Sequence, residues 1–193
     1  MHRRHVLALG LAALAQPTLA APTPYRLGPG GATITYLFTL NGGQVKGTVP
    51  VGRAALSIDP TNLAASTADV TADIRRARTG LIFATEALKS KSVLDAQGFP
   101  QARFTSTRVT LGPGGRLSDG ATIDGNLTLR GVTRPVRFAA DLFRKRGSDA
   151  GDLSALDVRM RGRINRSDFG ATGYADIVEN SVGIDIQADI IVA

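Results

Sequence analysis

Residues that could carry out nucleophilic or metal chemistry are scarce in this sequence. The chain has no cysteine, and its two histidines, His2 and His5, lie at the very start. Ser-His-Asp and Cys-His nucleophile systems need an imidazole base. Protein zinc and copper sites are mostly built on histidine or cysteine. Because both histidines lie in a segment that we expect to be removed on export, we expect a protein that is not an enzyme and that has neither a metal site nor a catalytic cofactor.

Carboxylates are the next candidates for chemistry, and 14 of the 16 are aspartates. Two carboxylates can act as general acid and general base. The three aspartates best placed for this role alternate with apolar residues along two segments, so a solvated outer strand face explains them better than catalysis. They are Asp157, Asp185 and Asp189.

Arginines form a row on the same polar face, at Arg159, Arg161 and Arg163. Such a row could attract an anionic lipid or glycan, but pairing with acids on neighbouring strands is the simpler expectation. Nucleic-acid binding is not expected, because those surfaces combine basic residues with exposed aromatic ones and aromatic residues make up only 5% of this chain.

The first 20 residues have the organisation of a secretory signal peptide. Arg3 and Arg4 precede an apolar run at residues 6–15, and small residues come before a cleavage site after Ala20. The run is shorter than the roughly 20 residues that span a bilayer. We expect residues 1–20, with both histidines, to be removed on export. A single domain of residues 21–193 would remain, in the periplasm or secreted.

Alternation of apolar and polar residues dominates the rest of the chain and indicates half-buried antiparallel strands. Gly- and Pro-containing turns separate the segments, so an all-β sandwich or barrel is predicted. The segment Leu-Gly-Pro-Gly-Gly, at 27–31 and again at 111–115, is predicted to form two of the turns. The clearest strands are residues 121–130, 135–143, 156–164 and 182–190, and shorter candidates are 32–39, 44–51, 53–59, 67–75 and 102–111.

One stretch departs from this alternation. Residues 81–94 carry apolar side chains at spacings near three and four, with Glu86 early and Lys89 and Lys91 late. That charge order suits the helix dipole, and the spacing suits an amphipathic helix. We therefore predict one substantial helix at about 81–94.

The sequence leaves open whether the interior of such a fold is filled by side chains or holds a ligand. About eight strands closed into a barrel leave space for side chains alone or for one small ligand. Several residues on the predicted inner face are small. They could leave room for a ligand or let a tight core close, and the pattern leaves both interpretations open. These residues are Gly125, Ala140, Gly162 and Ala188.

Three segments resemble signatures of the YceI-like family, in the order and spacing of that family. They are residues 99–107 (FPQARFTST), 125–136 (GNLTLRGVTRPV) and 164–170 (INRSDFG), and the overall resemblance covers residues 25–193. It implies an exported, lipocalin-like closed antiparallel barrel with a helix near one end. It also implies a long apolar cavity for a polyisoprenoid, such as a quinone tail, or a similar amphiphile, and no catalysis.

One departure from the family pattern lies in the helix. The family often has an Asp-x-His-Leu-type stretch there, whereas residues 85–88 read Thr-Glu-Ala-Leu here. The missing histidine leaves open which polar contact a head group would make, and with it the class of ligand.

The leading hypothesis is therefore an exported binding protein that transports, stores or sequesters a long-chain amphiphile. In the third motif, Arg166, Asp168 and Phe169 would close the barrel or hold a head group, and Gly131 and Pro135 suit a turn between two strands. Alternation assigns nine residues to the cavity wall: Phe38, Phe104, Ile123, Leu127, Phe138, Val158, Met160, Ile184 and Ile186.

The alternative hypothesis is a barrel with a filled core. It would act as an interaction or stress protein of the cell envelope, and its basic strand faces would contact anionic surfaces. The partners expected from the two hypotheses are a hydrophobic small molecule or lipid and, transiently, a membrane surface.

Overall fold

The computed structural model describes residues 22–59, 62–114, 119–149 and 151–193. The predicted signal peptide at residues 1–20, with its cleavage site after Ala20, lies outside the described residues. The same holds for Gly115, the last residue of the second Leu-Gly-Pro-Gly-Gly segment.

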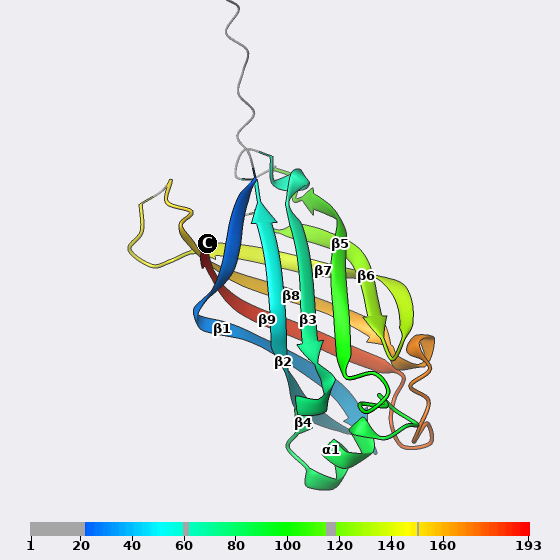
Figure 1. The fold of residues 1–193 in the computed structure, drawn as a ribbon. Coiled ribbons are helices and arrows are strands. Elements are labelled where there is room, and N and C mark those ends of the chain that lie inside the picture. Colours follow the sequence, from blue (N-terminus) through cyan, green and yellow to red (C-terminus); the bar gives the residue numbers. More distant parts are fainter. Residues whose placement is uncertain (1–21, 60–61, 115–118, 150) are drawn as a thin grey trace, which may run out of the picture.

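Long antiparallel strands form a closed barrel (Figure 1). The strands follow the order β1-β9-β8-β7-β6-β5-β3-β2, and β1 also pairs with β2, which closes the sheet on itself. The short strand β4 adds to β2 beyond this ring. The predicted barrel of about eight strands is thus confirmed. The strands are β1 (Thr23–Leu40), β2 (Gly43–Ile58), β3 (Thr67–Asp73), β4 (Arg78–Thr79), β5 (Gln101–Leu111), β6 (Ala121–Leu129), β7 (Val132–Arg144), β8 (Ala155–Asn165) and β9 (Ser181–Val192).

Alternation decides which side chains enter the barrel. In β8, Val158 and Met160 face the interior, whereas Arg159 and Arg161 are exposed. Successive side chains of a strand point to opposite faces of the sheet, so a single period-two sequence supplies both an apolar inner wall and a charged outer surface.

The first Leu-Gly-Pro-Gly-Gly segment, residues 27–31, is not a turn between strands as predicted. It lies inside β1, where the pairing with β9 shifts register between Leu27 and Ala32. Gly31 has φ +63°, a conformation that glycine adopts without steric cost. The segment is therefore a bulge that bends a long strand. The second copy leaves β5 as a turn at its described residues.

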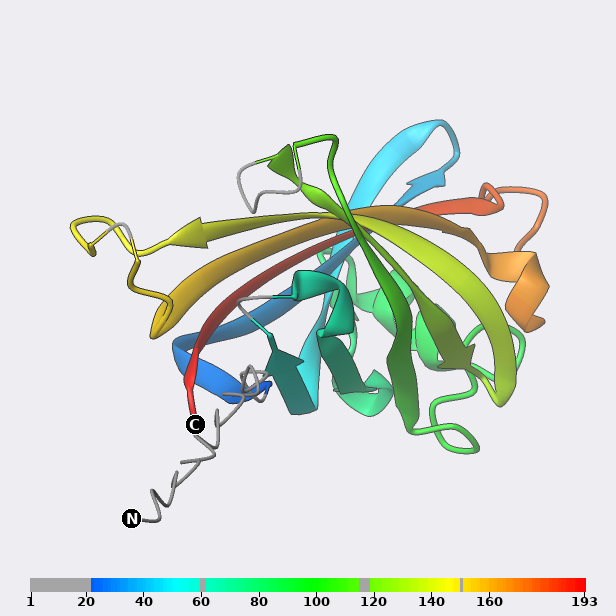
Figure 2. The same cartoon turned by 90° about the horizontal axis from the view of Figure 1, so that it is seen from above.

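A bulge also joins two predicted strands. The predicted strands 44–51 and 53–59 belong to the single strand β2, which ends at Ile58, and its pairing with β3 shifts register between Val51 and Arg53. The intervening Gly52 breaks the alternation, which explains why the sequence pattern indicates two strands. Long bent strands of this kind help a sheet to curve around its interior, as Figure 2 shows.

Two hairpins have two-residue turns with positive φ at both positions, as in type I′ turns. Asn41 and Gly42 join β1 to β2, and Arg130 and Gly131 join β6 to β7. Pro135, predicted at the second turn, lies instead within β7, opposite Asn126. The pairing of β7 with β8 begins only at Phe138, so this proline, which has no N–H to donate, occupies an edge segment that tolerates it.

The predicted helix is present but shorter than expected. Helix α1 (Ile82–Lys89) ends before Ser90, whose backbone is extended and whose hydroxyl donates to the carbonyl of Ala87. Serine competes for backbone hydrogen bonds in this way and favours helix ends. Residues 90–94, predicted as helical, instead form turns. Short 3-10 helices are η1 (Leu63–Ala65), η2 (Ile74–Arg76) and η4 (Arg166–Phe169).

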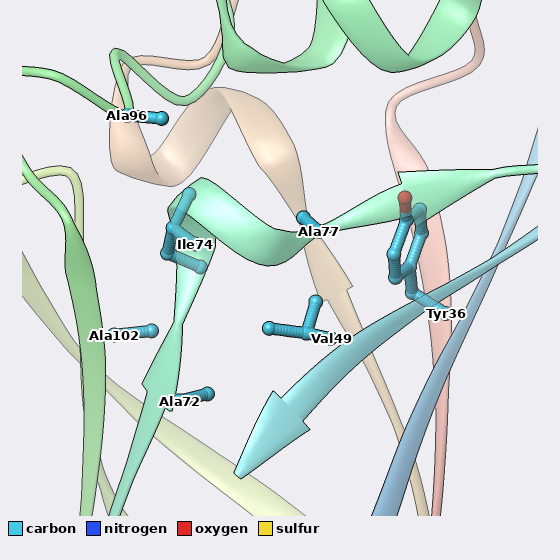
Figure 3. Close-up of a cluster of buried hydrophobic side chains, with 7 residues drawn as sticks. All are labelled: Tyr36, Val49, Ala72, Ile74, Ala77, Ala96 and Ala102. Atoms are coloured by element: carbon cyan, nitrogen blue, oxygen red, sulfur yellow. The ribbon is translucent and has the colours of Figure 1, made fainter. Parts of the chain in front are cut away.

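The buried core consists of two clusters near opposite ends of the barrel. One gathers Tyr36, Val49, Ile74 and several alanines where β2, β3 and η2 meet (Figure 3). The other consists of Tyr25, Ile58, Leu156 and Ile190, near the start of β1. Between the two clusters, Phe138 is buried, whereas Ile123, Met160 and Ile186 are only partly buried and line an apolar cavity.

Substitutions of Phe169 test whether its side chain closes the end of the barrel beside η4. Its side chain is 1% exposed, and Phe169→Ala should lower the free energy of unfolding by about 3–5 kcal/mol because it leaves a cavity. Phe169→Leu should cost less than about 1.5 kcal/mol. Urea denaturation measures both. A Phe169→Ala variant as stable as the parent would show that this ring does not close the barrel.

Candidate ligand-binding cavity

An apolar cavity of about 300 Å³ occupies the middle of the barrel. Every barrel strand contributes to its wall, together with α1 and the segment between β8 and β9. Small-molecule sites in proteins measure roughly 300–1,000 Å³, so this space is sufficient for a ligand. Its wall is almost entirely aliphatic and aromatic, which suits an apolar chain rather than a polar metabolite.

All nine residues assigned to the wall by alternation line this cavity. They come from six strands: Phe38, Phe104, Ile123, Leu127, Phe138, Val158, Met160, Ile184 and Ile186. Their inward orientation follows from the pattern, while their contact with a ligand stays a prediction.

The wall also has residues that the sequence analysis missed. On β2 the inward set is Val49 and Val51, then Ala54 and Leu56. The alternation shifts by one residue between Val51 and Ala54, because the bulge at Gly52 inserts an extra residue. Alternation on each side of that glycine could have found these residues. On β3 the inward residues Ala68, Val70 and Ala72 alternate without a break.

Glycines on the inner face make room for aromatic rings. A Cβ at Gly125 would collide with the Phe104 ring, and one at Gly162 would lie 2.6 Å from the Phe138 ring. The two rings meet edge to face, with centroids 5.4 Å apart, an arrangement that aromatic pairs favour. These small residues therefore let the two rings pack against each other along the wall.

Tyr36 and Phe38 stack in another part of the wall, with ring centroids 6.1 Å apart. Gly47 faces Tyr36, and a Cβ there would collide with the tyrosine ring. The Tyr36 hydroxyl donates to the carbonyl of Arg78 at 2.8 Å. Burial raises the pKa of this hydroxyl above its ordinary value, so it stays protonated and keeps donating.

Arg166 is the buried charged residue of the cavity wall. Its guanidinium donates to four backbone carbonyls: Nε to Glu179 at 3.1 Å, Nη1 to Ala171 at 2.6 Å and to Gly173 at 2.8 Å, and Nη2 to Val178 at 2.9 Å. Burial lowers the pKa of Arg166 below its ordinary value, but arginine remains charged in proteins.

These bonds hold the segment between β8 and β9 against the barrel end. Arg166 does not pair with Asp168. The Asp168 side chain is exposed, and its backbone carbonyl accepts a hydrogen bond from Arg134 Nε at 3.1 Å. Asp168 therefore lies outside the cavity wall, whereas Arg166 lines it and Phe169 is buried at its end.

The charged outer face behaves largely as a solvated surface. Arg161 Nε contacts Asp185 Oδ2 at 3.2 Å, the cross-strand pair expected from the alternation. Arg159 differs, because its guanidinium lies 5.3 Å from the centroid of the Phe143 ring. Lys145 Nζ bridges Asp157 at 2.5 Å and Asp189 at 2.9 Å. The acidic residues of this face are thus engaged by neighbouring cations.

Two further features bear on chemistry. Residues 22–193, apart from the undescribed positions, contain no cluster of three histidine, cysteine or acidic side chains that could hold a metal ion. No helix in that same part of the chain is both long and apolar enough to cross a bilayer.

Comparison with known sequences places most of the chain in one family. Residues 25–190 match the family described as YceI-like domain. A UPF0312 protein of Vibrio vulnificus is 30% identical over 191 residues, covering 94% of this chain and 98% of that protein. A protein of Salmonella arizonae named YceI is 34% identical over 116 residues, covering 60% of this chain and 58% of that protein.

Solved structures show the same fold. BcnA of Burkholderia cenocepacia superposes with a TM-score of 0.70 at 20% identity, covering 82% of this chain and 95% of that one. A domain from Saccharophagus degradans, described as a polyisoprenoid binding domain implicated in plant cell wall breakdown, gives a TM-score of 0.63 at 11% identity. It covers 88% of this chain and 98% of that one.

The role of Arg166 can be separated from that of an ordinary arginine. Arg166→Met should lower the free energy of unfolding by about 3 kcal/mol, because one buried and three partly buried hydrogen bonds are lost and a buried carbonyl without a donor costs about 1–3 kcal/mol. Arg163→Met, the same change at an exposed arginine of β8, should stay within about 0.5 kcal/mol. Chemical denaturation compares the two. A fully stable Arg166→Met variant would show that these four hydrogen bonds do not hold the barrel end.

Proposed function

The chain belongs to the YceI-like domain family, and from this premise we propose that it is an exported, non-enzymatic carrier of a long-chain amphiphile, such as a polyisoprenoid. The apolar cavity through the barrel is the observation that carries the proposal. Transport, storage and sequestration under stress all use such a site, and the cavity serves each of them.

The energetics of the cavity favour a long apolar chain. Each buried methylene contributes roughly 0.8 kcal/mol, so a tail can bind tightly without many polar contacts. The wall offers aliphatic side chains along the barrel, among them Val158, Met160, Ile184 and Ile186. The relative from Saccharophagus degradans, described as a polyisoprenoid binding domain, supports this class of ligand.

In this proposal the cavity offers few polar groups to a ligand. Helix α1 has no histidine, and its Thr85 hydroxyl is engaged by Thr79. Arg166 has five N–H donors, and four of them are directed at carbonyls. The remaining Nη2 hydrogen is the group we assign to an acceptor on a ligand head group. Affinity would then come mainly from the tail.

The alternative of a filled-core envelope protein fits the structure less well. That hypothesis needs side chains to occupy the barrel interior, whereas a cavity of about 300 Å³ lies there. Its basic strand face is also partly neutralised, since Arg161 pairs with Asp185 and Arg159 lies against Phe143. We retain the periplasm as the place of action, on the strength of the signal-peptide pattern in residues 1–20.

Filling the cavity tests the proposal directly. Ala188 lines the cavity and Gln187, the preceding residue of β9, is exposed. Ala188→Phe should displace the ligand by occupying its space, and Gln187→Phe should leave it bound. Native mass spectrometry of protein purified from the periplasm, with solvent extraction, measures the added mass.

Each result has a clear meaning. A discrete added mass in the parent and in Gln187→Phe, reduced at least about tenfold in Ala188→Phe, would support the carrier. A parent protein without added mass, and without uptake of added quinone, would contradict it. Equal loading of both variants would place the ligand outside this cavity.

A further inference from the structure

The N-terminal turn of α1 exposes a cluster of large apolar side chains. Leu81 is followed by Ile82, 86% exposed, and Phe83, 71% exposed. Single exposed apolar residues are common, but contiguous ones mark interaction surfaces. These three consecutive residues, termed here the apolar tip, lie at the end of the barrel away from the C-terminus (Figure 1).

The same helix forms part of the cavity wall. Ala84, Ala87 and Leu88 line the cavity, directly after the apolar tip in the chain. Helix α1 therefore has one face toward the proposed ligand and one end toward solvent. None of its residues is fully buried, and Leu88 is the residue that packs against the core cluster around Tyr36 and Ile74.

The two ends of α1 are attached differently. Beyond its C-terminal end, the Gly173 N–H donates to the carbonyl of Ser92 at 2.8 Å, and Arg130 Nη2 donates to that of Lys91 at 2.7 Å. At the N-terminal end the contacts are local, between Thr79 and Thr85 and the Leu81 carbonyl. The apolar tip thus lies between the attachment of β4 to β2, at Thr79, and the rest of the helix, and its own side chains remain exposed.

Three basic residues lie in the segments that lead to the apolar tip or pair beside it. Arg76, Arg78 and Lys46 are exposed, and in the described part of the chain no carboxylate lies within salt-bridge distance of them. The pairing of Thr79 with Gly47 brings β4 beside the Lys46 segment. Two other cations of this region, on η2 and α1, are already paired with acids. Arg76, Arg78 and Lys46 therefore remain available to an anionic partner beside the apolar tip.

We propose that the apolar tip and these three basic residues dock the protein on an anionic lipid bilayer. Apolar side chains that enter the acyl boundary beside cations that meet lipid head groups are the features of interfacial binding. Docking would bring the α1 wall of the cavity to the membrane for exchange of the amphiphile. This exchange step rests on the proposed function, whereas docking itself does not.

The absence of tryptophan from the chain permits a direct test. Phe83→Trp places a single reporter on the apolar tip, and Phe143→Trp places one on an exposed ring near the opposite end of the barrel. Vesicles of phosphatidylglycerol and phosphatidylcholine should shift the emission of the Phe83→Trp variant to shorter wavelength and leave that of the Phe143→Trp variant unchanged. Vesicles of phosphatidylcholine alone should produce a much smaller shift.

Vesicle sedimentation then separates the two contributions. Ile82→Ser with Phe83→Ser should weaken partitioning on the order of a hundredfold, because two large side chains no longer leave water. Arg76→Gln with Arg78→Gln should weaken it about fivefold per charge, and added salt should act in the same direction. Both double variants change exposed residues, so circular dichroism should show an unchanged fold.

Other outcomes overturn the proposal. An unshifted emission of the Phe83→Trp variant with anionic vesicles rules docking out. A shift that grows with protein concentration and needs no vesicles assigns the tip to a second copy of this chain. Native mass spectrometry of the same samples reports the bound amphiphile separately, so a failure of docking and a failure of the carrier function are distinguishable.

Discussion

Closure of the sheet by the pairing of β1 with β2 is the constraint on which the rest of the structure depends. β1 pairs with β2 along one edge and with β9 along the other. Closure satisfies the backbone hydrogen bonds of both edges and gives every strand an inner and an outer face. The width of the resulting ring is set by the backbone, and the inward side chains are too small to fill it.

Glycine has two separate uses in meeting this constraint. At Gly31 and Gly52 it accompanies bulges that let long strands bend. At Gly47, Gly125 and Gly162 it gives space to an aromatic ring from a neighbouring strand. The rings therefore lie along the wall rather than across the interior. This arrangement explains how a barrel with several aromatic residues on its inner face can still keep an open cavity.

The parts of this structure that follow from local periodicity could be predicted from the sequence. Alternation identified the inward residues of β8 and β9, because apolar and polar residues alternate along most of both strands. Such a strand buries its apolar side chains in only one register. It missed the continuity of β1 and β2, since a bulge looks like a turn when only Gly and Pro are read. It also could not place Arg166, whose four partners come from a segment without periodic pattern. Such contacts depend on the closed fold.

An apolar cavity of this kind also limits how its ligand can leave. A tail with ten buried methylenes would lose about 8 kcal/mol on entering water, roughly a millionfold in equilibrium terms. Release of the ligand into water would be slow because of this cost. A route from the cavity into another apolar phase avoids this cost. Helix α1 lines the cavity, has no fully buried residue, and carries exposed Ile82 and Phe83 at its N-terminal end, with basic neighbours. The physical demands of release and the features of that helix therefore coincide.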